Sequence, residues 1–174
     1  LQSIVLPNTV KTIGDCAFYD CESLKNPTLP NGILHIGEDA FSGCESLTSI
    51  VIPDNITSIN KDTFWHCINL QSVKLHDKIV SIEEDAFGDC ENLSDIELPP
   101  NLEKIGMSAF YKCVNIKNIR IPKSVKLIER NAFGDWTASQ TIYIEGRSYA
   151  PSAWVENEYY SWDKYCNAKI VWNA

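Results

Sequence analysis

Apolar side chains recur along this chain with a period of 23 residues, and this repeat organises the sequence. Phenylalanine and isoleucine each return at this step through six copies, at Phe18, Phe41, Phe64, Phe87, Phe110 and Phe133 and at Ile13, Ile36, Ile59, Ile82, Ile105 and Ile128. The copies share the template L-x-x-I-x-L-P-x-x-V-x-x-I-G-x-x-A-F-x-x-C-x-x and fill residues 1–138. A unit this short cannot bury its own apolar face, so the copies must stack and share one core.

Each copy predicts the same elements. Residues 49–53 are rich in β-branched side chains that alternate with a period of two, which is typical of a short strand. Stacked copies of this strand form a parallel sheet that advances about 4.8 Å per coil. A second extended piece follows, and the Ala-Phe-x-x-Cys segment spaces its apolar residues as a single helical or 3₁₀ turn does. The repeat therefore predicts a β-rich α/β solenoid of short parallel strands, with one such turn in each coil.

Three places depart from the template. Pro27 stands where other copies have Ile or Val, and it predicts a distorted second strand because proline cannot donate to the ladder. Residues 139–174 hold three of the five tryptophans. They predict a degenerate seventh coil and a C-terminal cap, with Trp154 and Trp162 as a lid and residues 170–172 as a closing strand. The pattern is already in progress at Leu1, so we expect this sequence to be part of a longer protein.

The template resembles the leucine-rich repeat of the BspA-like type. The junction Cys44-Glu45-Ser46-Leu47 and the tail with Ser152-Ala153-Trp154, Ser161-Trp162 and Ile170-Val171-Trp172 are also similar to that family. The resemblance implies a right-handed leucine-rich-repeat solenoid. It also implies a protein of the microbial cell surface or secreted fraction, exported by a signal segment upstream of Leu1. Some members are adhesins that bind host matrix proteins or other cells, and the resemblance brings no catalytic residues.

The charge balance limits the classes of partner. The chain has 23 acidic and 15 basic residues, for a net charge of −8. Such a surface disfavours nucleic acid and anionic membranes, which are themselves negatively charged. No apolar run approaches the roughly 18 residues that a membrane-spanning helix requires. We therefore expect a protein or glycan partner and no membrane insertion within this chain.

Two rows of residues are expected to face outward from the strands, because the Ile and Leu positions between them face inward. The flanking row is Ser3, Asn26, Ser49, Ser72, Asp95, Asn118 and Thr141. The other row is Val5, Thr28, Val51, Lys74, Glu97, Arg120 and Tyr143, and it changes from apolar to charged to aromatic. Arg and Tyr are favoured anchors of interfaces. We predict that Val51, Lys74, Glu97, Arg120 and Tyr143 bind the partner; the alternative is a solvated sheet face.

Cysteine forms a further column of the repeat, at Cys21, Cys44, Cys67, Cys90 and Cys113, with Trp136 in the sixth place. A metal site would need closely clustered ligands such as C-x-x-C, which the sequence lacks. Disulfides between stacked coils would hold the Cβ atoms too far apart. The Trp136 replacement favours a third interpretation, in which the cysteines are free, buried, apolar fillers. Cys16 lies in a polar column and is expected to be exposed.

Candidate catalytic or cofactor-binding motifs are missing from the sequence. It has no H-E-x-x-H, no G-x-S-x-G and no phosphate-binding loop, and its three histidines occupy different columns. The predicted turn edge is acidic, which allows a calcium ladder, but the carboxylates are not placed strictly from copy to copy, so a solvated acidic face is expected. We predict no enzyme activity, metal or cofactor. The expected function is an adhesin-like binding module; the alternative is a structural spacer or an intracellular protein-interaction scaffold.

Overall fold

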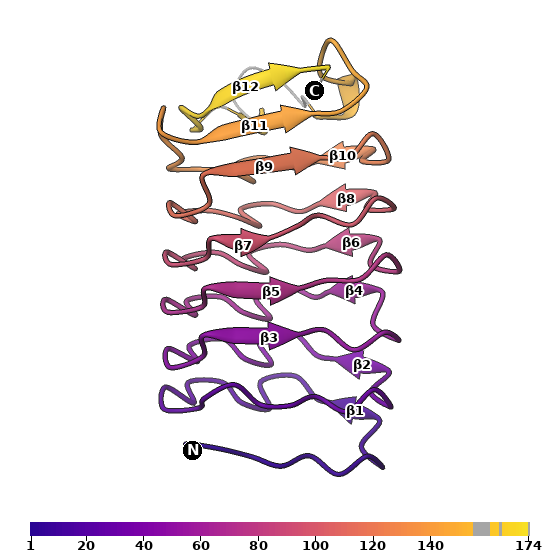
Figure 1. Cartoon of the computed structure of the whole chain (residues 1–174), viewed down its shortest axis with the longest axis vertical. Coiled ribbons are helices and arrows are strands. Elements are labelled where there is room, and N and C mark those ends of the chain that lie inside the picture. The colour runs from indigo at the N-terminus through magenta and orange to yellow at the C-terminus, as the bar shows by residue number, and fades with distance from the viewer. Residues whose placement is uncertain (155–160, 164, 174) are drawn as a thin grey trace.

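A computed structural model describes residues 1–154, 161–163 and 165–173 of the chain. The chain winds as one stack of coils, with its two termini at opposite ends (Figure 1). Residues 155–160, 164 and 174 of the expected cap lie outside the described residues. Within the described part of the chain, no helix is long and apolar enough to cross a membrane.

Two sets of parallel strands line two sides of the stack, and they run in opposite directions across the view in Figure 1. The first side, named the sheet face, carries β3 (Ser49–Val51), β5 (Ser72–Lys74), β7 (Asp95–Ile96), β9 (Asn118–Ile121), β11 (Thr141–Ile144) and β12 (Lys169–Trp172). The second side carries β1 (Thr12–Ile13), β2 (His35–Ile36), β4 (Ser58–Ile59), β6 (Ser81–Ile82), β8 (Lys104–Ile105) and β10 (Leu127–Ile128).

The strands pair one repeat apart, as the period of 23 predicts. Ser49 lies opposite Ser72, and Ser58 lies opposite Ser81. Inward positions such as Ile50 and Ile59 are buried, whereas their outward neighbours are at least partly exposed. The predicted solenoid of short parallel strands is therefore confirmed.

The segments between the second side and the next strand, named the turn edge, contain single hydrogen bonds of the 3₁₀ type but, within the described residues, no helix, so the expected helical turn is not confirmed. Two residues in each repeat adopt a left-handed conformation, such as Asp85 at φ 49° and Asp89 at φ 56°. A left-handed residue at this spacing interrupts a right-handed helix. The amides alternate between two kinds of partner: Trp65 N bonds within its own coil to Asp62 O at 3.1 Å, whereas Phe64 N bonds to Ala86 O of the adjacent coil at 3.0 Å. Among the described residues the one helix is the 3₁₀ helix η1 (Ser152–Trp154), so the fold is a β-solenoid.

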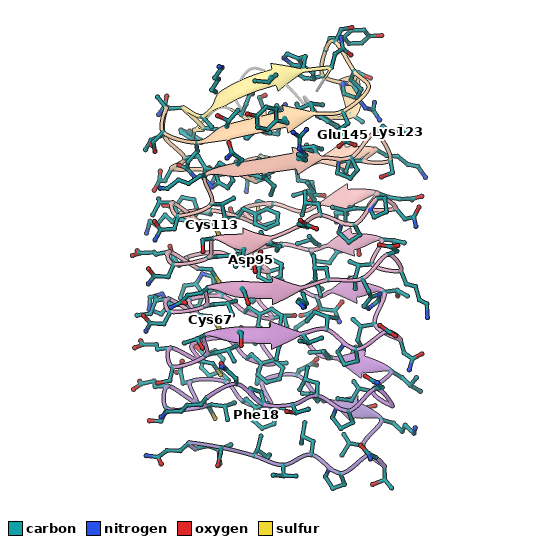
Figure 2. All side chains as sticks on the ribbon, viewed as in Figure 1. Phe18, Cys67, Asp95, Cys113, Lys123 and Glu145 are labelled. Atoms are coloured by element: carbon teal, nitrogen blue, oxygen red, sulfur yellow. The ribbon has the colours of Figure 1, made fainter. Side chains whose placement is uncertain are left out.

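A continuous stack of phenylalanine rings forms the centre of the core. The six rings, from Phe18 near the N-terminal end (Figure 2) to Phe133, have centroids 5.1–5.6 Å apart and interplanar angles of 3–19°. Beyond Phe133, Trp136 and Trp162 pack edge-on, and Trp154 packs on Trp162. The expected closing strand is present as β12, which pairs with β11. Together these elements close the C-terminal end of the core.

The strand of the second repeat is distorted, as Pro27 predicts. No strand is assigned to residues 24–30. The side chain of Asn26 replaces the missing ladder, because its Oδ1 accepts hydrogen bonds from the amides of Thr48 at 2.9 Å and Ser49 at 3.0 Å. A side-chain oxygen thus accepts from the amides of the next coil where no backbone carbonyl does so.

The cysteine column is free of disulfides and mostly buried, as predicted. Burial raises the pKa of the Cys44 thiol to about 12 and raises the pKa of the next three thiols as well. Each of these four thiols also donates to a phenylalanine carbonyl of the preceding coil, at 3.1–3.2 Å. Trp136 makes the same bond through Nε1, at 2.8 Å from Phe110 O. The interpretation as an apolar filler was therefore incomplete, because the column supplies a buried donor as well.

Candidate functional site

The predicted binding row lies on the sheet face. Val51 pairs in register with Lys74, and Arg120 pairs with Tyr143. Val51 is 63% exposed, Lys74, Glu97 and Arg120 are exposed, and Tyr143 is half-buried. The five residues are thus on one side of the molecule, although they do not form one continuous patch.

The sheet face is divided between β7 and β9. The strands β3, β5 and β7 form one sheet, β9, β11 and β12 form another, and no pairing between β7 and β9 is assigned within the described residues. The strand β7 ends at Ile96, whereas β9 continues for four residues. The tandem Pro99-Pro100 also distinguishes this coil, because the other coils have a single proline, a histidine or a glutamate at the corresponding turn. The sheet therefore opens beside Glu97 and Arg120.

A hollow of about 460 Å³ occupies this opening. Its apolar wall is formed by Ile96, Leu98, Pro100 and Pro122, and its polar groups come from Glu97, Asn118, Arg120 and Glu145. In Figure 2, Glu145 lies at the end of β11. A concave site with an apolar wall and a few convergent polar groups is the usual form of a binding site.

Arg120 is the central charged group of this hollow. Its guanidinium carbon lies 4.7 Å from the centre of the Tyr143 ring, so the aromatic ring orients the cation. Among the described residues no carboxylate forms an ion pair with Arg120. Its donors are consequently available for a carboxylate or for backbone carbonyls, while Glu97 and Glu145 can accept from a cationic or amide group.

The predicted residues differ in their relation to the hollow. Glu97 and Arg120 line it, and Tyr143 supports Arg120 from the adjacent strand. Val51 lies in a separate depression beside the distorted second repeat, and Lys74 lines neither. Sequence reasoning missed Glu145. The available signal was its column, because Glu145 stands where the template has proline.

The turn edge carries a column of carboxylates with perturbed protonation. Burial, together with the nearby charge of Asp62, raises the pKa of Asp85 to about 6. Burial likewise raises the pKa of Asp62, with a contribution from Asp39. Lys61 forms an ion pair with Glu84 at 3.0 Å on this edge. In the described part of the chain, no group of three or more His, Cys, Asp or Glu is placed to hold a metal ion.

The fold and the repeat define the class of protein as a leucine-rich-repeat solenoid. Residues 1–79 and 58–152 match the BspA type leucine rich repeat region, in six copies. The chain therefore belongs to the BspA-type leucine-rich-repeat family. No curated protein sequence matches the chain at a significant level.

Solved structures of bacterial leucine-rich-repeat proteins are similar to this chain. The leucine-rich-repeat protein TpLRR of T. pallidum is 32% identical, with a TM-score of 0.66, over 70% of this chain and 59% of that chain. A leucine-rich repeat protein from Eubacterium ventriosum is 24% identical, with a TM-score of 0.71, over 90% of this chain and 46% of that one. A leucine rich cell surface protein from Faecalibacterium prausnitzii is 22% identical, with a TM-score of 0.60, over 100% of this chain and 60% of that one.

The chain spans 46–60% of the length of these three structures. The likenesses to the Eubacterium and Faecalibacterium proteins concern the fold alone. Family membership makes the chain a protein-interaction module, since the leucine-rich-repeat solenoid is generally a non-enzymatic binding fold.

Proposed function

We propose that this solenoid is the binding module of a cell-surface or secreted, adhesin-like protein, and that it binds a partner protein through the sheet face. The observation that carries the proposal is the hollow between β7 and β9, where Arg120 is held by Tyr143 and flanked by Glu97 and Glu145. The description of the Faecalibacterium relative as a cell surface protein supports this location.

The chemistry of the hollow favours a protein segment as its ligand. Arg120 can bind a carboxylate or a pair of carbonyl oxygens through its planar donors. The apolar wall at Leu98, Pro100 and Pro122 would cover an adjacent aliphatic or aromatic side chain. A peptide offers both groups in one chain. Host matrix proteins and surface proteins of neighbouring cells are the expected source.

Binding to immobilised matrix proteins and to intact host cells tests the proposal. The variant Arg120→Ala is compared with native protein and with Lys126→Ala. Lys126 is also exposed, but it directly precedes β10 on the second side and pairs with Glu103 at 2.7 Å. We expect Arg120→Ala to weaken binding at least about tenfold, the effect of losing one interface anchor, while Lys126→Ala binds as the native protein does. Equal binding by all three proteins would refute a role for this face.

A structural or intracellular scaffold is the second candidate. All seven cysteines are free, and exported proteins more commonly use cysteine in disulfides. Four of these thiols are buried donors to carbonyls, which gives them a structural reason to stay reduced in either compartment. Protease shaving of intact source cells separates the two functions: release of peptides from these repeats supports a surface location, and full protection with a cytosolic signal supports the scaffold.

A further inference from the structure

A row of aromatic side chains runs along the turn edge, away from the sheet-face hollow. The residue that follows each core phenylalanine alternates strictly between large aromatic and small: Tyr19, Ser42, Trp65, Gly88, Tyr111 and Gly134. Aromatic rings therefore occur in every second coil. The exposed fractions are 48% for Tyr19 and 37% for Trp65, and Tyr111 is partly exposed.

The small residues make room for the rings. A Cβ atom on Gly88 would lie 3.1 Å from Cδ1 of Trp65, and one on Gly134 would lie 2.9 Å from Cδ2 of Tyr111. Each of these rings thus extends over the glycine of the next coil. Ser42, which holds the corresponding position in the coil after that of Tyr19, is fully buried. The alternation leaves three aromatic platforms along the stack.

Neighbouring side chains fix two of these platforms, Trp65 and Tyr111. His66 lies against Trp65, with ring centres 5.2 Å apart. Lys112 Nζ lies 5.1 Å from the centre of the Tyr111 ring and forms an ion pair with Asp89 at 3.2 Å. Asp135 accepts a hydrogen bond from the Tyr111 hydroxyl, which raises the pKa of that phenol. The rings are therefore positioned, and they are flanked by groups that can exchange hydrogen bonds with hydroxyls.

The spacing of the platforms restricts the ligand. The phenylalanine stack advances 5.1–5.6 Å per coil, so rings two coils apart are separated by about 10 Å. This distance is close to the length of one disaccharide in an extended β-1,4-linked chain, whose sugar rings pack their C–H faces on aromatic rings. Three platforms match five or six consecutive sugars.

Charge restricts the ligand further. Asp20 follows Tyr19 in the sequence, and Asp135 accepts a hydrogen bond from Tyr111. Glu45 and Asp89 lie 3.8 and 3.9 Å from the ring nitrogens of His66, the neighbour of Trp65. These groups repel sulfated or carboxylated glycans and accept hydrogen bonds from hydroxyl or amino groups. We propose that the aromatic row Tyr19, Trp65 and Tyr111 is a second binding site, for an extended and uncharged β-1,4-linked polysaccharide.

Calorimetry with defined oligosaccharides tests this site. The probes are the β-1,4-linked hexamers of glucose, xylose, mannose and N-acetylglucosamine, with the α-1,4-linked glucose hexamer as a geometric control. We expect at least one β-linked hexamer to bind, to bind more tightly than its dimer, and to exceed the α-linked control. Failure of all four β-linked hexamers to bind, or equal binding of the α-linked control, would overturn the proposal.

Variants locate the site. Trp65→Ala should weaken binding of the hexamer about tenfold, as expected from the loss of one stacking contact, and Trp65→Phe should retain most of it. Arg120→Ala on the sheet face should have no effect. Far-ultraviolet circular dichroism establishes that each variant is folded. Unchanged affinity of a folded Trp65→Ala would place the sugar elsewhere, and loss in Arg120→Ala alone would assign it to the sheet-face hollow instead.

Discussion

The phenylalanine stack allows a test of how stability is distributed along the solenoid. Phe87 is fully buried, and its ring stacks on Phe64 at 5.5 Å and on Phe110 at 5.6 Å. Phe87→Ala removes both contacts and leaves a cavity in the middle of the core. Such a truncation costs about 3–5 kcal/mol, which is a large part of the ~5–15 kcal/mol that stabilises a whole domain.

Phe87→Ala should also weaken the coupling between the two ends of the solenoid. In a stacked repeat, each coil is stabilised mainly by its two neighbours, so a defect in a central coil weakens the coupling between the two ends. Four of the five tryptophans lie in residues 136–172, while Trp65 lies on the other side of Phe87. Tryptophan fluorescence therefore reports mainly on the C-terminal part, and far-ultraviolet circular dichroism reports on all coils.

Urea unfolding with both probes is the assay. The native protein should show coincident transitions, whereas Phe87→Ala should show separate midpoints and the loss of free energy given above. Phe18→Ala is the matched control, because Phe18 stacks on one ring only and is 8% exposed. It should cost less than Phe87→Ala and leave the two probes coincident. A smaller cost for Phe87→Ala than for Phe18→Ala would refute the idea that the stack couples the coils.

Three further predictions concern polar groups inside the repeat. Asp85→Asn should raise the free energy of unfolding at pH 7.5 and flatten its decline as the pH rises from about 4 to 6 in urea titrations, because the folded-state pKa of about 6 exceeds the ordinary aspartate value of 3.8 and ionisation in this window costs stability; an unchanged pH profile would contradict it. At pH 7.5, iodoacetamide should label the exposed Cys16 first, and peptide mass spectrometry should find the buried thiols unmodified until denaturant unfolds the chain; early labelling of Cys44, Cys67, Cys90 and Cys113 would argue against their burial. Asn26→Ala should lower the free energy of unfolding by about 1–3 kcal/mol in the same urea assay, since two amides of the next coil lose their acceptor; a loss near zero would mean that the ladder re-forms without the side chain.

The architecture follows from the sequence because each interior position recurs, with the same type of residue, in six copies. One inward isoleucine or phenylalanine is weak evidence, but the same residue in register through all copies specifies a face, a period and a stacking direction. The distortion at Pro27 was predictable from a single residue. Proline has a local, context-independent effect on a ladder.

The left-handed residues of the turn edge were not predicted, because apolar spacing does not specify backbone conformation. An Ala-Phe-x-x-Cys segment spaces its apolar residues as a helical turn does, yet four of the six residues at the first left-handed position are Asp or Asn, which enter this region more readily than most. The donor role of the cysteine column was equally hidden. It depends on a carbonyl of the preceding coil, which only the stacked structure brings to the thiol.

The candidate sites were the least predictable part because they lie where the repeat is broken. The hollow depends on the missing pairing between β7 and β9, and its acidic residue Glu145 replaces a template proline. The aromatic row depends on a period of two coils instead of one. A column that is uniform through all six copies serves every coil equally, and therefore maintains the stack. Columns that vary or alternate distinguish one part of the surface from another, and recognition of a partner requires such distinction.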